Sequence, residues 1–301
     1  MKFWTRIKYF VRDHLFNMMA HCAPRKFAGV LYKRAFHRPL NWSDPQDINE
    51  KINWLKFYGD TSLWTQLADK YCVREYVQER GLADLLIPLY GHWDQVEEID
   101  WKSLPAQFVM KTNNGSGDVL ICKDKSTLDI AEWSRHFKKM LKLKFGYFQA
   151  EPHYNLIPPC IIAEKYLSAD KQPLHSSSII DYKVWSFDGK PAYVWVCYNR
   201  THDGTDVAVY DTDWTFHPEY SISTPHYRLT DKQVPRPQTL PQMLNAAAVL
   251  SKGHPQVRVD FYEVEGKLYF GEMTMTAAAG FNDFYSDIFL KELGRLCIIK
   301  K

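Results

Sequence analysis

The chain has 301 residues, enough for two or three packed lobes around a substantial core, and its 46% hydrophobic and 24% charged residues are ordinary for a soluble globular protein. Six cysteines without a CxxC or CxxH pair exclude the usual zinc sites and disulfide frameworks and favour a reducing, cytoplasmic compartment. No run of about 18 apolar residues occurs, so no segment is expected to span a membrane.

Residues 1–40 are the most basic part of the chain, with nine lysines and arginines against one acid, Asp13. Apolar residues at helical spacing over 3–20 predict a basic amphipathic helix, and the charges that interrupt them are not typical of a secretory signal. This helix either docks on the core with its basic face in water or contacts an anionic polymer or the inner membrane surface. Because the basic residues are confined to one end, we expect no nucleic-acid binding.

The rest of the chain changes from helices to strands near residue 108. Helical patterns follow a turn at 41–45 and run over 61–80, with a short strand and turn at 85–91. An amphipathic helix is predicted at 127–145, a loop at 224–241 and a helix at 242–251. Asp188-Gly189 indicates a hairpin. The predicted strands are 108–111, 119–122, 161–166, 180–187, 192–198 and 207–210.

The segment 259–274 is a predicted β-hairpin, because two aromatic-rich runs flank Glu265-Gly266. A two-residue turn would put Glu265 at positive φ, which is unfavourable outside glycine. We therefore expect a three-residue loop with Gly266 in the left-handed bulge position. This register places Glu263 opposite Lys267, a favourable cross-strand pair.

The same register places two carboxylates, Asp260 and Glu272, on one face of the hairpin. As diagonal neighbours they would lie roughly 7–8 Å apart at the backbone. Carboxylates at this separation can share a divalent cation, and Mg²⁺ is favoured because it combines hard oxygen ligands with phosphate oxygens. The hairpin therefore predicts a nucleotide–metal site.

A glycine-rich segment follows Lys111, at the end of a predicted strand: Thr-Asn-Asn-Gly-Ser-Gly over 112–117. Glycines allow backbone N–H groups to approach phosphate oxygens, and the lysine supplies a positive charge. The GK[ST] ending of a Walker A loop is missing. An ordinary hairpin turn uses the same residues, so this segment alone does not decide between the two.

Other charged residues stand at the ends of predicted elements. The strand at 161–166 leads into Glu-Lys-Tyr-Leu, where backbone groups and a leucine would suit an adenine edge. Lys183 lies on the next strand, Arg258 two residues before Asp260, and Lys70 at a helical turn. Each of these has a simpler interpretation as a solvated charge at the end of an element.

Five segments in this order resemble the ATP-grasp superfamily, and more narrowly its TupA-like branch, named for teichuronopeptide biosynthesis and found among bacterial surface-polysaccharide genes. They are ADKYCVREYV, LPAQFVMKTNNGSGDVLIC, IIAEKYL, DYKVWSFDGKP and VRVDFYEVEGKLYFGEMT. The resemblance implies an α+β fold in which two α+β subdomains grip ATP behind a helical amino-terminal segment. The expected boundaries are 1–60 for the helical segment, 61–107 for an amino-terminal lobe, 108–168 for the glycine-lid and adenine-hinge subdomain, and 169–301 for the metal-binding subdomain.

The resemblance also implies roles for individual residues. The expected nucleotide-binding residues are the phosphate-binding Lys70, Lys111 and Lys183, the lid Gly115, Ser116 and Gly117, and the adenine hinge Glu164, Lys165, Tyr166 and Leu167. The expected catalytic cations are Lys111, Lys183 and Arg258, the last stabilising an acyl phosphate. The expected Mg²⁺ ligands are Asp260, Glu272 and Thr274, although many ATP-grasp ligases have Asn at the third of these positions.

The implied activity is an ATP-dependent carboxylate–amine ligase in bacterial cell-surface polysaccharide biosynthesis, with ATP and Mg²⁺ as cofactors. It would join an amine or amino acid to a uronic acid or similar carboxylate, releasing ADP and phosphate. The expected location is cytoplasmic, with residues 1–40 able to reach an anionic membrane surface. The alternatives are a kinase on the same fold, a polysaccharide glycosyltransferase, and an ATP-binding scaffold without turnover.

Overall fold

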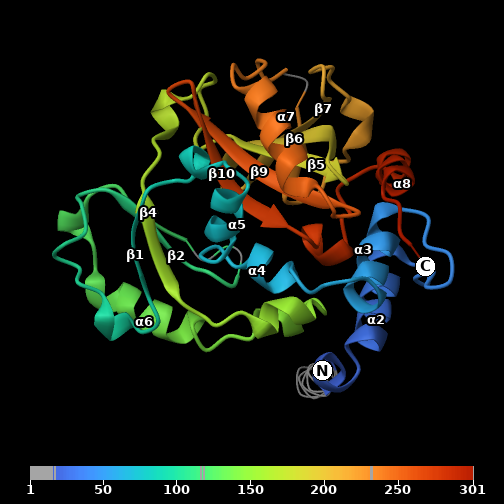
Figure 1. Cartoon of the computed structure of the whole chain (residues 1–301), viewed down its shortest axis with the longest axis horizontal. Helices are drawn as coiled ribbons and strands as arrows, with labels where there is room; N and C mark the ends of the chain where they lie inside the picture. Colours follow the sequence, from blue (N-terminus) through green and yellow to red (C-terminus); the bar gives the residue numbers. More distant parts are fainter. Residues whose placement is uncertain (1–15, 17, 116, 118, 231–232, 301) are drawn as a thin grey trace, which may run out of the picture.

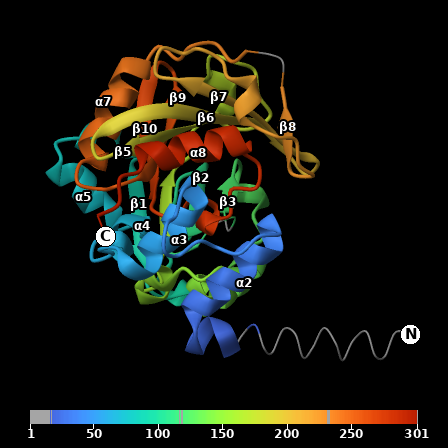
Figure 2. The same ribbon diagram turned by 90° about the vertical axis from the view of Figure 1, so that its right-hand side faces the viewer.

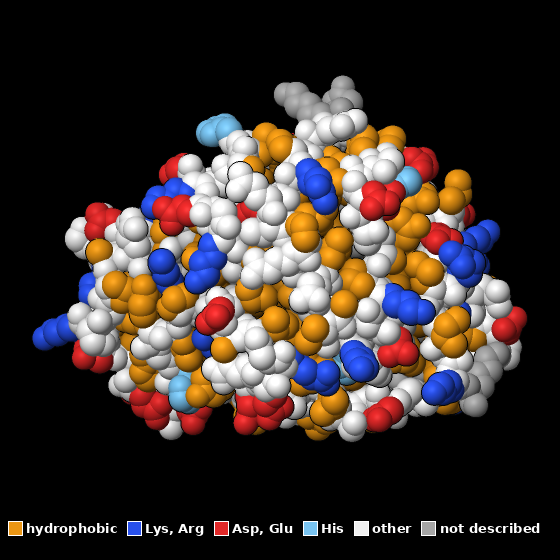
Figure 3. Space-filling view, turned by 45° about the horizontal axis from the view of Figure 1, so that its top comes forward, with side chains coloured by type: hydrophobic (Ala, Val, Ile, Leu, Met, Phe, Trp, Pro, Cys, Tyr) orange, Lys and Arg blue, Asp and Glu red, His pale blue; other side chains and the backbone are white. Residues whose placement is uncertain are grey.

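A computed structural model describes residues 16, 18–115, 117, 119–230 and 233–300, and these form two antiparallel-rich sheets with helices around them (Figure 1). The predicted helix at 3–20 lies almost wholly outside the described residues. No helix among those described has the length and apolarity needed to cross a bilayer. On the face shown in Figure 3, charges of both signs are interspersed with apolar side chains.

The smaller sheet has the strand order β1-β4-β2-β3, all antiparallel. Helix α6 and the residues around β1 complete its separate hydrophobic core, in which Phe108, Met110 and Phe137 are fully buried. The elements are β1 (Leu89–Trp93), β2 (Phe108–Thr112), β3 (Val119–Cys122), β4 (Ile161–Lys165) and α6 (Ile130–Met140).

The larger sheet has the order β10-β9-β5-β6-β7-β8, and only the short β7–β8 pair is parallel. Asp188 and Gly189, with φ of 44° and 80°, form the predicted hairpin turn between β5 and β6. The strands are β5 (Asp181–Phe187), β6 (Lys190–Thr201), β7 (Gly204–Asp211), β8 (Tyr227–Leu229), β9 (Val257–Val264) and β10 (Lys267–Thr274).

The main hydrophobic core lies on the larger sheet. Helix α7 packs against β5, β6 and β9, and α8 packs against α3 (Figures 1 and 2). Helices α4 and α5 lie where the two sheets meet, α4 against β10. The helices are α2 (Pro24–Phe36), α3 (Ile48–Tyr58), α4 (Trp64–Ala68), α5 (Val73–Glu79), α7 (Leu240–Ser251) and α8 (Asp287–Leu296).

The predicted helix at 61–80 is wrong as a continuous element, because the chain breaks between α4 and α5. The Oδ1 atom of Asp69 accepts hydrogen bonds from the backbone N–H groups of Tyr71 and Cys72, at 2.8 and 3.2 Å. Aspartate commonly competes with a helix in this way. The break turns Lys70 out of the helix and towards the glycine-rich loop.

Other differences from the prediction are local. The segment predicted as a loop at 224–241 contains the three-residue strand β8, and the helix predicted at 127–145 is shorter, as α6. Helices α2 and α8 were not predicted. Ser286 is the N-cap of α8, and its hydroxyl accepts from the N–H of Phe289.

Candidate functional site

The hairpin of β9 and β10 turns in two residues, Glu265 and Gly266, whose φ angles are 55° and 68°. The predicted three-residue loop and the pairing of Glu263 with Lys267 are therefore wrong. The N–H of Glu265 donates to the carbonyl of Lys171 at 2.8 Å, and its carboxylate contacts the Lys171 ammonium at 2.5 Å. These contacts hold a non-glycine residue in a conformation that costs of order 1–3 kcal/mol.

A β-bulge at Gly271 brings the two hairpin carboxylates together. Phe270 pairs with Phe261 and Glu272 pairs with Asp260, so two steps along β10 match one step along β9. Without the bulge, the two-residue turn would place Glu272 on the opposite face from Asp260, because side chains alternate along a strand. The predicted shared face is therefore correct, but Asp260 and Glu272 are direct partners and not diagonal ones.

Asp260 is 1% exposed and lies between two cations. Arg258 donates Nε to Oδ1 and Nη2 to Oδ2, both at 2.8 Å, and Lys183 donates Nζ to Oδ2 at 2.5 Å. Burial opposes ionisation of this carboxyl, but the two positive charges outweigh it and hold the pKa of Asp260 below its ordinary value. Asp260 is therefore an ionised carboxylate at neutral pH.

Lys183 is 7% exposed and has a second carboxylate partner, Asp181, at 2.6 Å. Burial disfavours the ammonium, but the charges of Asp181 and Asp260 outweigh it and raise the pKa of Lys183. Burial raises the pKa of Asp181, against the charges of Lys183 and of Arg200 at 3.6 Å. Lys183 remains charged and is held between two anions.

Glu272 is the more accessible of the hairpin carboxylates, with its side chain 37% exposed. Its Oε1 atom accepts from the Thr274 hydroxyl at 3.3 Å and lies 3.5 Å from Nη2 of Arg258. The same Arg258 nitrogen donates to the Thr274 hydroxyl at 3.2 Å. The predicted ligand Thr274 thus lies beside Glu272 and orients it.

On the smaller sheet, Glu164 of β4 lies between two cations and is 6% exposed. The ammonium of Lys111, on β2, is 2.7 Å from Oε2, and Nη1 of Arg74, on α5, is 3.3 Å from Oε1. Burial lowers the pKa of Arg74, against the charge of Glu164. The predicted phosphate lysine Lys111 and the predicted hinge residue Glu164 are therefore direct partners.

Lys70 connects the lid to the rest of the site. Its ammonium donates to the carbonyl of Gly115, and its N–H donates to the carbonyl of Asn113 at 3.1 Å. Burial lowers the pKa of Lys70, the negative charge of Glu272 opposes this, and the positive charge of Lys111 adds to it. Groups from both sheets therefore act on Lys70, and the two halves of the predicted site face each other.

The remaining predicted nucleotide-binding residues belong to the glycine-rich loop after β2 and to the segment at the end of β4. Gly117 is exposed with φ of 79°, and Ser116 lies outside the described residues. At the end of β4, the N–H of Lys165 donates to the Pro88 carbonyl at 2.9 Å, and Tyr166 and Leu167 lead the chain towards the larger sheet. Leu167 is buried in a cluster with Ile87, Val264 and Tyr269, beside the hairpin.

The oxygen atoms present fit a cation that also binds phosphate. A carboxylate has about four acceptor sites, and the contacts with Arg258 and Lys183 leave Asp260 room for one more partner. Glu272 is partly exposed opposite it. Among the residues described, no group of three or more His, Cys, Asp or Glu could enclose a metal. Mg²⁺ is commonly bound by one or two carboxylates together with phosphate oxygens of the substrate, which matches these residues.

Three polar residues of the site were not assigned a role from the sequence. Asp181 stands two residues before Lys183 on one strand, so the shared face could have indicated it. Arg74 follows Lys70 by four residues, a spacing that places two residues on one face of a helix, so it could have been assigned to the site as well. Tyr154 had no such signal: burial raises its pKa, and the charges of Glu151 and Glu272 raise it further, which places this phenol near the hairpin carboxylate.

A family model described as TupA-like ATPgrasp matches residues 50–298 of the sequence. The chain belongs to the TupA-like ATP-grasp family. This membership confirms the resemblance and the predicted α+β ATP-grasp fold with a helical amino-terminal segment. A search of curated protein sequences found no match.

Several solved structures are similar to this TupA-like protein. An L-amino acid ligase from Bacillus licheniformis is 12% identical with a TM-score of 0.46, over 77% of this chain and 49% of that one. The D-alanine–D-alanine ligase from Bacillus anthracis complexed with ATP is 14% identical with a TM-score of 0.43, over 81% of this chain and 67% of that one. The ATP-grasp ligase PsnB complexed with minimal precursor is 11% identical with a TM-score of 0.41, over 83% of this chain and 67% of that one. This chain thus spans about half the length of the first.

Proposed function

We propose that this protein is an ATP-dependent carboxylate–amine ligase that forms a C–N bond and releases ADP and phosphate. The observation that carries the proposal is the pairing of Asp260 with Glu272 across the Gly271 bulge. Lys70, between α4 and α5, lies near both Glu272 of this pair and Lys111 of the smaller sheet. In a member of the ATP-grasp family, this arrangement supports phosphoryl transfer from ATP.

The proposed reaction has two steps. A carboxylate oxygen of the first substrate attacks the γ-phosphorus of ATP, and the bond to the departing ADP breaks, which gives an acyl phosphate. The amine nitrogen of the second substrate then attacks the carbonyl carbon, a C–N bond forms, and the C–O bond to phosphate breaks. The amine loses its proton to solvent. Because little covalent chemistry falls to the protein, positioning and charge neutralisation account for catalysis.

In this proposal the residues of the chain bind and neutralise phosphate oxygens. Asp260 and Glu272, with Thr274 beside them, would hold Mg²⁺, and the ion would neutralise negative charge on the phosphates of ATP. Lys111 would exchange its contact with Glu164 for phosphate oxygens. Lys183 would do the same with one of its two carboxylates.

Arg258 would stabilise the acyl phosphate. It already spans Asp260 and Thr274, and the charges of Asp260 and Glu272 outweigh the effect of burial and raise its pKa. A guanidinium that is fixed in this way can receive negative charge without reorganising. The adenine would bind at Glu164 to Leu167, where β4 ends and the chain passes from one sheet to the other.

We further propose that the substrates belong to bacterial surface-polysaccharide assembly, with a uronic acid or similar carboxylate and an amine or amino acid. The resemblance to the TupA-like branch supports this context. Helix α2 adds Arg25, Lys26, Lys33 and Arg34 to the basic amino-terminal region, and these suit an anionic polymer or membrane surface.

The test is a product assay with Mg²⁺-ATP and a panel of hexuronic acids combined with amino acids. We expect ADP and phosphate in equal amounts only when a carboxylate and an amine are both present. Asp260→Asn should abolish turnover, and the exposed-surface variant Lys291→Gln should not change it. ADP release with a phosphorylated product and no free phosphate would instead identify a kinase. Full activity of Asp260→Asn would contradict the proposed site.

A further inference from the structure

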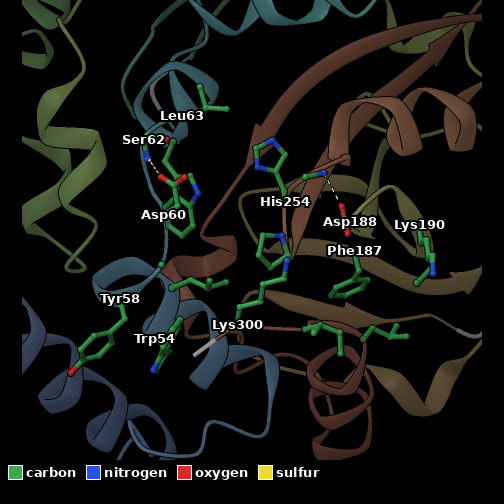
Figure 4. A pocket seen from close by; sticks show the side chains of 18 of the residues that line it. Trp54, Tyr58, Asp60, Ser62, Leu63, Phe187, Asp188, Lys190, His254 and Lys300 are labelled. Atoms are coloured by element: carbon green, nitrogen blue, oxygen red, sulfur yellow. Dashed lines mark hydrogen bonds between the residues drawn. The ribbon is translucent and has the colours of Figure 1, made fainter.

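A pocket separate from the proposed nucleotide site opens between four segments of the larger half of the molecule. They are the connection from α3 to α4, the β5–β6 turn, the connection from α7 to β9, and the tail after α8 (Figure 4). Its volume is about 890 Å³. This is within the range of small-molecule sites, roughly 300–1,000 Å³.

The pocket lies at the far end of β5 and β9 from the proposed chemistry. Phe187, the last residue of β5, is four residues from Lys183, and Pro255 lies two residues before the start of β9, which carries Asp260. At about 3.3 Å per residue, the distance along β5 is roughly 13 Å. A monosaccharide-sized ligand in the pocket would therefore not reach the carboxylate pair, whereas an extended chain would.

Aromatic side chains provide apolar faces in this pocket. The rings of Trp54 and Tyr58 lie 5.4 Å apart at an angle of 32°, and Tyr58 is 47% exposed. Phe187 lines the opposite side (Figure 4). The face of an aromatic ring is negative, so it attracts the weakly positive C–H groups on one face of a sugar ring.

Two carboxylates, Asp60 and Asp188, supply hydrogen-bond acceptors. The Oδ1 atom of Asp60 accepts from the N–H of Ser62 at 2.9 Å, and that of Asp188 accepts from the N–H of Gly253 at 2.8 Å (Figure 4). Each contact fixes the orientation of its carboxylate and leaves acceptor sites for other donors. The pocket therefore suits a ligand that carries hydroxyl groups.

Two lysines supply positive charge from different segments. Lys190 comes from the start of β6 and Lys300 from the carboxy-terminal tail (Figure 4). Neither forms an ion pair with another described residue, whereas the nearby Arg295 is paired with Glu292 at 2.8 Å. Single, separated ammonium groups suit single anionic charges distributed along a ligand.

We propose that this pocket binds an acidic saccharide, a short chain of sugar rings that carry carboxylates. Such a ligand uses all three features together: C–H faces for Trp54 and Tyr58, hydroxyl donors for the two aspartates, and carboxylates for the two lysines. A polyphosphate would be repelled by the aspartates. An apolar ligand would desolvate four charged groups without replacing their hydrogen bonds.

This inference rests on the proposed function only in one respect, that the saccharide would be the polymer on which the ligase acts. The test uses the full chain without nucleotide, and calorimetry with trigalacturonic acid and with maltotriose, a neutral trisaccharide of equal length. The variants are Trp54→Ala and the double substitution Lys190→Gln, Lys300→Gln. Lys291→Gln, an exposed lysine of α8 outside the pocket, is the matched control.

We expect trigalacturonic acid to bind at least tenfold more tightly than maltotriose. Both pocket variants should weaken its binding at least tenfold, and the control should leave it unchanged. Equal binding of the two trisaccharides, absence of binding, or wild-type affinity in the lysine variant would overturn the proposal. Binding of a non-hydrolysable ATP analogue with Mg²⁺ is measured in parallel to separate the two proposals. If the wild type binds trigalacturonic acid but not the analogue, the proposed function is contradicted and the pocket proposal is not.

Discussion

Arg258 and Lys183 both contact the buried carboxylate of Asp260, so three charges share a volume with little access to water. In such a cluster the net contribution of the pairs is small, because desolvation offsets much of the attraction. The removal of one member is different. Loss of Asp260 leaves two buried cations with less compensation, Lys183 with Asp181 and Arg258 with Glu272 at 3.5 Å, and this loss can be measured.

Asp260→Asn should therefore destabilise the protein strongly. Two buried cations would lose their common anion, and breaking a buried pair costs about 3–5 kcal/mol. Urea unfolding at neutral pH measures this loss. The matched substitution Glu272→Gln removes a carboxylate that is 37% exposed and should change the free energy of unfolding by less than about 1 kcal/mol. Equal losses from both substitutions would contradict the charge balance described for Asp260.

A second residue-scale prediction concerns His153, which is 5% exposed and packs edge-on against Trp64, with no hydrogen bond to Nε2. Burial, and then the charge of Lys56, lower the pKa of His153 to about 3. The folded state thus favours neutral imidazole. The stability from this group is complete above the unfolded pKa of about 6.5 and is lost as pH falls towards 3.

Between pH 7 and pH 5 this linkage should cost roughly 1–2 kcal/mol of the free energy of unfolding. His153→Phe keeps the aromatic contact and removes the titration, so its loss over the same range should be smaller by about that amount. His202→Asn, at a fully exposed position, should behave like the wild type. Parallel slopes for the wild type and His153→Phe would show that His153 does not titrate as described.

At the scale of elements, the hairpin shows what the sequence could predict and what it could not. The shared face of Asp260 and Glu272 was predicted, but from a register that does not occur. The actual arrangement depends on Glu265 at positive φ, held by Lys171, and on a bulge at Gly271. Contacts between distant segments decide both features, so local propensity could not reveal them. The break at Asp69 did have a local signal.

Deletion of Gly271 tests the register of the hairpin directly. With the two-residue turn unchanged, the deletion would let Glu272 follow Phe270 and pair with Asp260 in a regular ladder, still on the same face. We expect a folded variant whose nucleotide affinity still increases with Mg²⁺. Circular dichroism checks the fold, and calorimetry with a non-hydrolysable ATP analogue checks the Mg²⁺ effect. Loss of the Mg²⁺ effect in a folded variant would contradict the pairing of Glu272 with Asp260.

At the scale of the whole molecule, direct contacts join helix α3 and the residues before it to the end of helix α8. The ammonium of Lys51, on α3, donates to the carbonyls of Gly294 and Cys297, both at 2.8 Å. A Cβ atom at Gly294 would lie 2.2 Å from the carbonyl oxygen of Gln46. The five motifs predicted the α+β ATP-grasp fold, but no motif indicated this contact, because it depends on close approach of backbone atoms.

Gly294→Ala distinguishes this close approach from simple helix propensity. Propensity favours alanine by about 1 kcal/mol in a helix, whereas the contact with Gln46 predicts a loss of about 1–3 kcal/mol from overpacking. We expect a lower free energy of unfolding in urea. Lys291→Ala on the same helix should change stability by less than about 0.5 kcal/mol. A more stable Gly294→Ala would contradict the packing of α8 against the segment before α3.

Asp260 and Glu272 are proposed to bind nucleotide through Mg²⁺. The most direct measurement is the affinity for a non-hydrolysable ATP analogue with and without Mg²⁺, in the wild type, Glu272→Gln and the control Lys291→Gln. We predict that Mg²⁺ raises affinity at least tenfold in the wild type and the control, because the metal links phosphate to the carboxylates. Glu272→Gln should lose this increase and keep its metal-free affinity. An undiminished Mg²⁺ effect in Glu272→Gln would contradict the account.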